Sequence, residues 1–105
     1  MTGLENRNNS YNLIMFAIID IETCGGTFQY KKGRIIEICV LVHDGLSVVE
    51  KFSTLVDPEC YITPIFTNIT GITNEMVQGA PKFHEIAKEI IRLTEGQIFV
   101  AHNVN

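Results

Sequence analysis

The first long apolar run of the chain reads Met15-Phe16-Ala17-Ile18-Ile19 and closes with Asp20-Ile21-Glu22-Thr23. A mostly apolar run of this length predicts a central β-strand that is buried on both faces. Gly25-Gly26 follow and end the strand. Because Asp20 and Glu22 are two residues apart, a strand points both carboxylates to one face, at its open end.

Two carboxylates on one face repel each other unless a cation neutralises them. Mg²⁺ is bound in proteins through one or two carboxylates and keeps its other positions for water and phosphate. The pair therefore indicates a metal site for phosphodiester chemistry. Short acidic pairs are common, however, so the spacing alone leaves open an ordinary strand end with two solvated acids.

The rest of the chain predicts an α/β domain. Two further strands, joined by a turn at Asp44-Gly45, are expected at residues 34–43 and 46–56. Proline and threonine signals then predict two short helices, one over residues 64–69 and one from Met76 with Thr73 as its N-cap. A longer amphipathic helix follows at 82–93, where Phe83, Ile86, Ala87, Ile90 and Leu93 form an apolar stripe, and the last strand covers 97–101.

Four segments follow the acidic pair in a characteristic order and spacing. They are Arg34-Ile35-Ile36-Glu37-Ile38, Phe52-Ser53-Thr54-Leu55-Val56-Asp57-Pro58, Thr70-Gly71-Ile72-Thr73-Asn74-Glu75-Met76-Val77 and Ile98-Phe99-Val100-Ala101-His102-Asn103. As an ordered set they resemble the DEDDh 3′–5′ exonucleases, which include the proofreading epsilon subunit of DNA polymerase III. The resemblance implies a ribonuclease H-like fold: a three-stranded antiparallel meander, then helices, then a parallel strand. Glu37, which interrupts its apolar strand, is interpreted as a strand-edge or face-switching residue rather than one that faces the acidic pair.

The resemblance also implies the site. Asp20 and Glu22 match the first acidic motif and would be catalytic metal ligands, Asp20 to both ions and Glu22 to one. Two Mg²⁺ or Mn²⁺ ions about 4 Å apart would stabilise the attacking hydroxide and the leaving 3′ oxygen. Ile21 and Thr23, and His102 and Asn103 of the second motif, would contact the substrate. Each has a structural alternative, since Ile21 on a regular strand points toward the core and the other three can serve as hydrogen-bonding residues at strand ends.

The second family motif continues with Phe and Asp after this point, whereas the sequence stops at His102-Asn103-Val104-Asn105, and a third motif has no counterpart. We therefore expect a truncated fold: a flexible leader at 1–14 and the N-terminal part of an exonuclease domain at 15–105, inactive by itself. Thr70 also replaces the His of a family His-Gly-Ile loop.

Composition is compatible with this interpretation. A net charge of −4 is unlike that of a protein that binds nucleic acid through bulk electrostatics, but metal ions and local contacts can hold a strand end. Three cysteines without Cys-x-x-Cys spacing predict free thiols in a reducing compartment. We expect a cytoplasmic location without membrane segments. The expected partner is a single-stranded 3′ end of DNA, with DNA polymerase subunits as further candidates. RNA trimming and a non-catalytic binding module for nucleic acid or protein are the alternatives.

Overall fold

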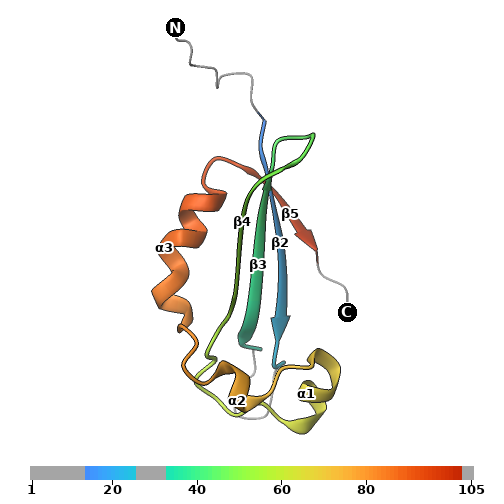
Figure 1. Ribbon diagram of the computed structural model, residues 1–105, viewed down its shortest axis with the longest axis vertical. Coiled ribbons are helices and arrows are strands. Elements are labelled where there is room, and N and C mark those ends of the chain that lie inside the picture. Colours follow the sequence, from blue (N-terminus) through green and yellow to red (C-terminus); the bar gives the residue numbers. More distant parts are fainter. Residues whose placement is uncertain (1–13, 26–32, 103–105) are drawn as a thin grey trace, which may run out of the picture.

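The computed structural model describes residues 14–25 and 33–102. Their strands form one four-stranded mixed sheet in the order β4-β3-β2-β5. β2 (Phe16–Thr23) pairs antiparallel with β3 (Ile35–His43), β3 pairs antiparallel with β4 (Val48–Leu55), and β2 pairs in parallel with β5 (Ile98–His102). The predicted meander followed by a parallel strand is therefore confirmed (Figure 1).

Three helices lie between β4 and β5 in the sequence. α3 (Phe83–Thr94) runs along one face of the sheet, whereas α1 (Pro64–Thr70) and α2 (Asn74–Val77) lie beyond the end at which β2 and β4 finish (Figure 1). In the described part of the chain, each helix is too short or too polar to span a membrane. The predicted leader falls, apart from residue 14, outside the described residues.

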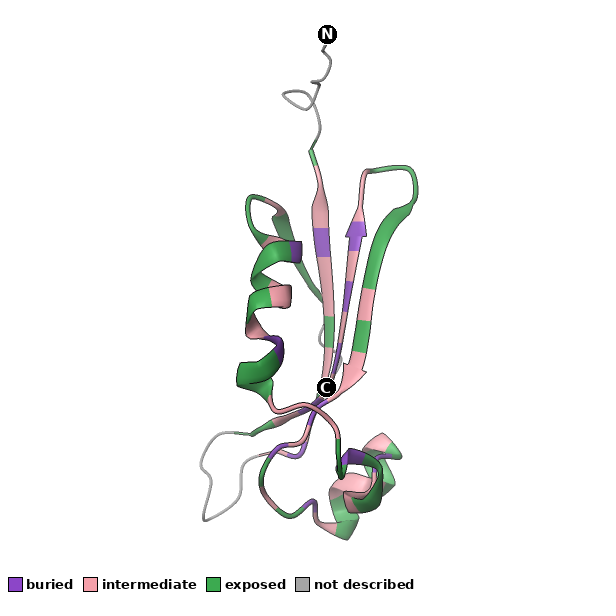
Figure 2. Ribbon diagram, turned by 60° about the vertical axis from the view of Figure 1, so that its left-hand side comes forward, coloured by how far each residue is buried: buried purple, intermediate pink, exposed green. Residues whose placement is uncertain are grey.

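Two apolar clusters hold these elements together. The first lies between the sheet and α3 and consists of Ile38, Val40, Val42, Val56, Ile86 and Leu93. The second joins the end of β2 to the α1–α2 region and consists of Cys24, Ile36, Ile62, Ile72 and Val77. Along β3 buried and half-buried residues alternate, whereas β4 is largely exposed (Figure 2).

Several sequence-based expectations need correction. β2 is central, as predicted, but it is not buried on both faces, because the described helices cover only one face of the sheet. Phe83 does not join the core stripe; it is 44% exposed in the first turn of α3. The short helix α2 begins at Asn74 rather than Met76, because the Thr73 hydroxyl caps it by accepting from the Met76 N–H at 3.1 Å.

The β3–β4 turn is also longer than predicted, which shortens β4 at its start. The carboxylate of Asp44 accepts hydrogen bonds from the N–H groups of Leu46 and Ser47, at 2.8 and 2.9 Å. These bonds lower the pKa of Asp44. They take the place of the backbone hydrogen bonds between the strands that would flank a two-residue turn. Gly45 supplies the left-handed backbone that this turn requires, with φ at +99°.

Candidate metal centre

β2 separates its apolar and acidic residues between the two faces of the sheet. Ile19 and Ile21 pack against the cluster beneath α3. Asp20 and Glu22 alternate with them and are exposed on the opposite face. The expectation that both carboxylates share one face is thus met. Ile21 has its side chain on the core side, so its predicted contact with substrate would have to come from its main chain.

The register of β2 and β3 adds a third carboxylate to this face. Asp20 is paired with Cys39 and Glu22 with Glu37, and directly opposed residues of an antiparallel pair project to the same side. Glu37 therefore lies on the acidic face of an interior strand, contrary to our interpretation, although β3 shifts register directly before it, between Ile35 and Glu37. Residues 35–43 are almost continuously apolar, so the sequence does not assign Glu37 to a face, and only the register shows that it lies opposite Glu22.

The other neighbour of β2 is β5, whose His102 is paired with Asp20. The main chain of Asp20 thus lies between two strands, β3 and β5, which fix its position. Asn103 lies outside the described residues. Substrate contacts of His102 and Asn103 remain predictions.

The end of β2 is shaped by a register shift between Glu22 and Thr23, after which Thr23 is paired with Ile35. Thr23 is half-buried, and its predicted substrate contact remains a prediction. Gly25 then turns the chain with φ at +74°, and a Cβ atom there would overlap the ring of Phe66 from α1. Close packing on a helix therefore determines where the chain leaves the acidic face.

Thr70, which stands where the resembled family has His, has a local structural role. Its hydroxyl donates to the carbonyl of Phe66 at 2.7 Å and accepts from the N–H of Ile72 at 3.1 Å. These bonds close the last turn of α1 and lead the chain into the buried Ile72. A threonine that is engaged in this way stabilises the loop.

The donor set suits a hard divalent cation in part. Asp20 and Glu22 provide carboxylate oxygens, the ligands that Mg²⁺ and Mn²⁺ prefer, and one or two such ligands suffice for Mg²⁺ when water and phosphate complete the shell. Within residues 14–25 and 33–102, no three His, Cys, Asp or Glu side chains gather closely enough to enclose an ion. The described residues therefore offer two carboxylates on an open face, and a complete metal site would need further ligands.

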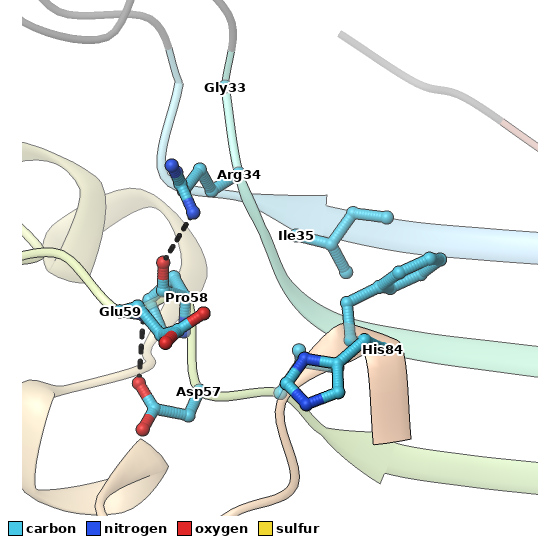
Figure 3. Close-up of a pocket in the computed structure, with 9 residues that line it drawn as sticks. Gly33, Arg34, Ile35, Asp57, Pro58, Glu59 and His84 are labelled. Carbon is cyan, nitrogen blue, oxygen red and sulfur yellow. Dashed lines mark hydrogen bonds between the residues drawn. The ribbon is translucent and has the colours of Figure 1, made fainter. Parts of the chain in front are cut away.

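A pocket of about 420 Å³ lies elsewhere, where β3 begins and β4 ends, next to the first turn of α3 (Figure 3). Arg34 lines it and donates from Nη1 to the carbonyl of Pro58 at 3.3 Å, and the N–H of Glu59 donates to Asp57 at 2.9 Å. His84 faces the same space. Asp20, Glu22 and Thr23 do not line this pocket, so the candidate metal centre lies on an open sheet face rather than in this cavity.

An exposed acidic pair at the end of a central strand, in a β-meander followed by a helix and a parallel strand, is the arrangement that the resemblance drawn from the sequence leads us to expect. Comparison with known proteins is more specific. The family model described as Exonuclease matches residues 17–105. The chain belongs to this exonuclease family.

Two curated relatives show the extent of the similarity. The chain is 37% identical over 91 residues to the 3′-5′ exonuclease DinG of Bacillus subtilis, covering 86% of this chain and 10% of that protein. It is 36% identical over 92 residues to the DNA polymerase III subunit epsilon of Treponema pallidum, covering 88% of this chain and 42% of that protein. The chain therefore spans less than half the length of either relative.

Solved structures agree on the fold. Exonuclease X, in a complex with 5′ overhanging duplex DNA, superposes with a TM-score of 0.67 at 31% identity, over 84% of this chain and 48% of that chain. An exonuclease I structure reaches a TM-score of 0.70 at 20% identity, over 87% of this chain and 22% of that chain. The ribonuclease H-like fold expected from the sequence is thus confirmed over the part that the chain contains.

Proposed function

We propose that this chain supplies the first metal-binding strand of a 3′–5′ exonuclease that removes nucleotides from the 3′ end of DNA. The observation that carries the proposal is the exposure of Asp20 and Glu22 on one face of a central strand, in a chain that belongs to the exonuclease family. Both carboxylates would hold divalent ions, Mg²⁺ or Mn²⁺. When bound, such ions stabilise the attacking and leaving oxygens of a phosphodiester.

The chain's own contribution is preorganisation. Asp20 is paired with Cys39 on one side and with His102 on the other, so its main chain moves little when an ion arrives. Glu22 faces Glu37, and two like charges directly opposite each other are unfavourable in the absence of a cation. A cation bound at this face would therefore be stabilised, because it relieves the repulsion between the two carboxylates.

DNA is the proposed substrate because relatives include a DNA polymerase subunit and an exonuclease that was solved with DNA. A single-stranded 3′ end, association with polymerase subunits and a cytoplasmic location belong to the same proposal. RNA trimming is the alternative within the family. A non-catalytic module is disfavoured by the exposed acidic pair, for which a pure binding scaffold has no need.

The test uses the complete protein that contains this sequence, with single-stranded DNA and RNA oligonucleotides labelled at the 5′ end. We expect stepwise shortening of DNA from its 3′ end that requires Mg²⁺ or Mn²⁺. Asp20→Ala or Glu22→Ala should lower kcat by at least about 10²-fold, because charge stabilisation in the transition state is lost. Glu95→Ala is the matched control, since Glu95 is an exposed acid in the turn after α3.

Two results would contradict the proposal. Wild-type rates in Asp20→Ala would show that this carboxylate does not serve catalysis. Degradation of RNA but not DNA would contradict the proposed DNA substrate, while the family and the proposed metal site would stand.

A further inference from the structure

Two cysteines from distant parts of the sequence meet at the end of β2. Cys24 directly follows β2, and Cys60 lies in the segment between β4 and α1; their Sγ atoms are 3.7 Å apart. A disulfide requires about 2.05 Å between the sulfurs, so side-chain rotation and a small shift of the chain would close the gap. We propose that Cys24 and Cys60 are a redox-active pair that forms a reversible disulfide bond.

The surrounding contacts hold the two segments together before any bond forms. Cys24 is 5% exposed in the second apolar cluster, and Cys60 packs against that cluster while remaining partly exposed. Arg34 links both segments: its carbonyl accepts from the N–H of Cys24 at 2.9 Å, and its Nη1 donates to the carbonyl of Pro58. The fold thus keeps the thiols in contact instead of leaving their encounter to diffusion.

The oxidant that balances the reaction is a small disulfide, such as glutathione disulfide. Cys60, the more exposed thiol, would lose its proton and attack one glutathione sulfur, which releases one glutathione thiol and leaves a mixed disulfide. Cys24 would then lose its proton and displace the second glutathione. The chain loses two hydrogen atoms, and the two electrons reduce glutathione disulfide to two thiols.

The environment of Cys60 slows this exchange but permits it. Burial, together with the neighbouring Cys24, raises the pKa of the Cys60 thiol to about 11, so that little thiolate is present at neutral pH. Exchange at neutral pH is therefore slow, whereas the extent of oxidation at equilibrium depends on the reduction potential of the pair relative to its surroundings. This inference does not depend on the proposed function, although the bond would form only two residues after Glu22.

The test is a redox titration of the full chain in glutathione buffers, followed by acid quenching, alkylation of free thiols and mass spectrometry of the intact chain and its peptides. A Cys39→Ser background removes the third thiol. We expect a Cys24–Cys60 bond that dithiothreitol reverses. Its equilibrium constant should be on the order of a hundredfold larger for the folded chain than for the urea-unfolded chain, because a disulfide that fits the native state stabilises it.

Peptide mapping of the wild-type chain in parallel shows whether the Cys39→Ser change itself alters which cysteines pair. The Cys60→Ser variant should not lose the two hydrogen atoms that mark disulfide formation. The proposal is overturned if the folded chain gives only a glutathione adduct at Cys60. It is also overturned if folding does not increase the equilibrium constant, or if Cys39 takes the place of either partner in the wild-type chain.

Discussion

At the scale of single residues, backbone pairing fixes the position of the acidic face. Asp20 and Glu22 project from a strand with neighbours on both sides, and sites on strands are held more accurately than sites on loops. The sequence predicted this pair because a period of two is enough to place both carboxylates on one face. It could not place Glu37 there, because cross-strand register depends on a turn whose length was misjudged.

The pH dependence of stability is also decided at a single residue, Cys60. Its pKa is raised from 9.0 to about 11 in the folded chain, so the unfolded chain ionises first as pH rises. The contribution of this thiol to the free energy of unfolding is complete below pH 9.0 and is lost as pH rises towards about 11.

We therefore expect the urea midpoint of the wild-type chain to fall more steeply above about pH 9 than that of Cys60→Ala, under reducing conditions. Parallel pH profiles for the two proteins would show that burial of Cys60 does not perturb its ionisation.

At the scale of elements, α1 determines how β2 ends. Phe66 packs where a side chain on Gly25 would lie, and Gly25 also has a left-handed φ of +74°. Gly25→Ala should lower the free energy of unfolding by about 2–4 kcal/mol, through backbone strain and overlap with the Phe66 ring together.

Gly45→Ala is the matched control for this effect. Gly45 has φ at +99° but no atom within 4 Å of an added Cβ, so its substitution introduces strain without overlap. Urea denaturation of both variants separates the two contributions, and an equal loss in the two would mean that Phe66 yields to the added methyl group.

The elements also show what sequence patterns can and cannot give. The order of strands and helices followed from periodicity and from turn residues such as Asp44 and Gly45. The exposure of Phe83 did not follow, because helical spacing identifies an apolar stripe but not where the covering surface stops. The Cys24–Cys60 contact was likewise hidden, since 36 residues separate partners that only the tertiary fold brings together.

At the scale of the whole molecule, the described sheet ends on an apolar edge. β5 is the outer strand next to β2, and Ile98, Phe99 and Val100 are 50%, 64% and 41% exposed. An edge strand with apolar side chains on both faces is a template for association with another chain. The sequence predicts a strand over 97–101, but it does not show that this strand lies at an edge of the described sheet with exposed side chains.

We accordingly expect the purified 105-residue chain to self-associate, with an apparent mass in analytical ultracentrifugation that rises with concentration. Phe99→Lys should shift this equilibrium towards monomer, because a charge at the edge opposes pairing. Leu46→Lys should not, since Leu46 is 92% exposed in the β3–β4 turn, away from β5. A wild-type chain that is monomeric at every concentration would contradict this account of β5.

The central claim is that Asp20 and Glu22 bind the catalytic metal ions, and Mn²⁺ titration of the chain followed by NMR tests it most directly. Paramagnetic broadening should centre on the amide signals of Asp20 and Glu22, extend across the strands to Glu37 and His102, and disappear in the Asp20→Asn, Glu22→Gln double variant. Glu95→Gln should leave the broadening unchanged. Broadening centred instead on Asp57 and Glu59, or its persistence in the double variant, would contradict the claim.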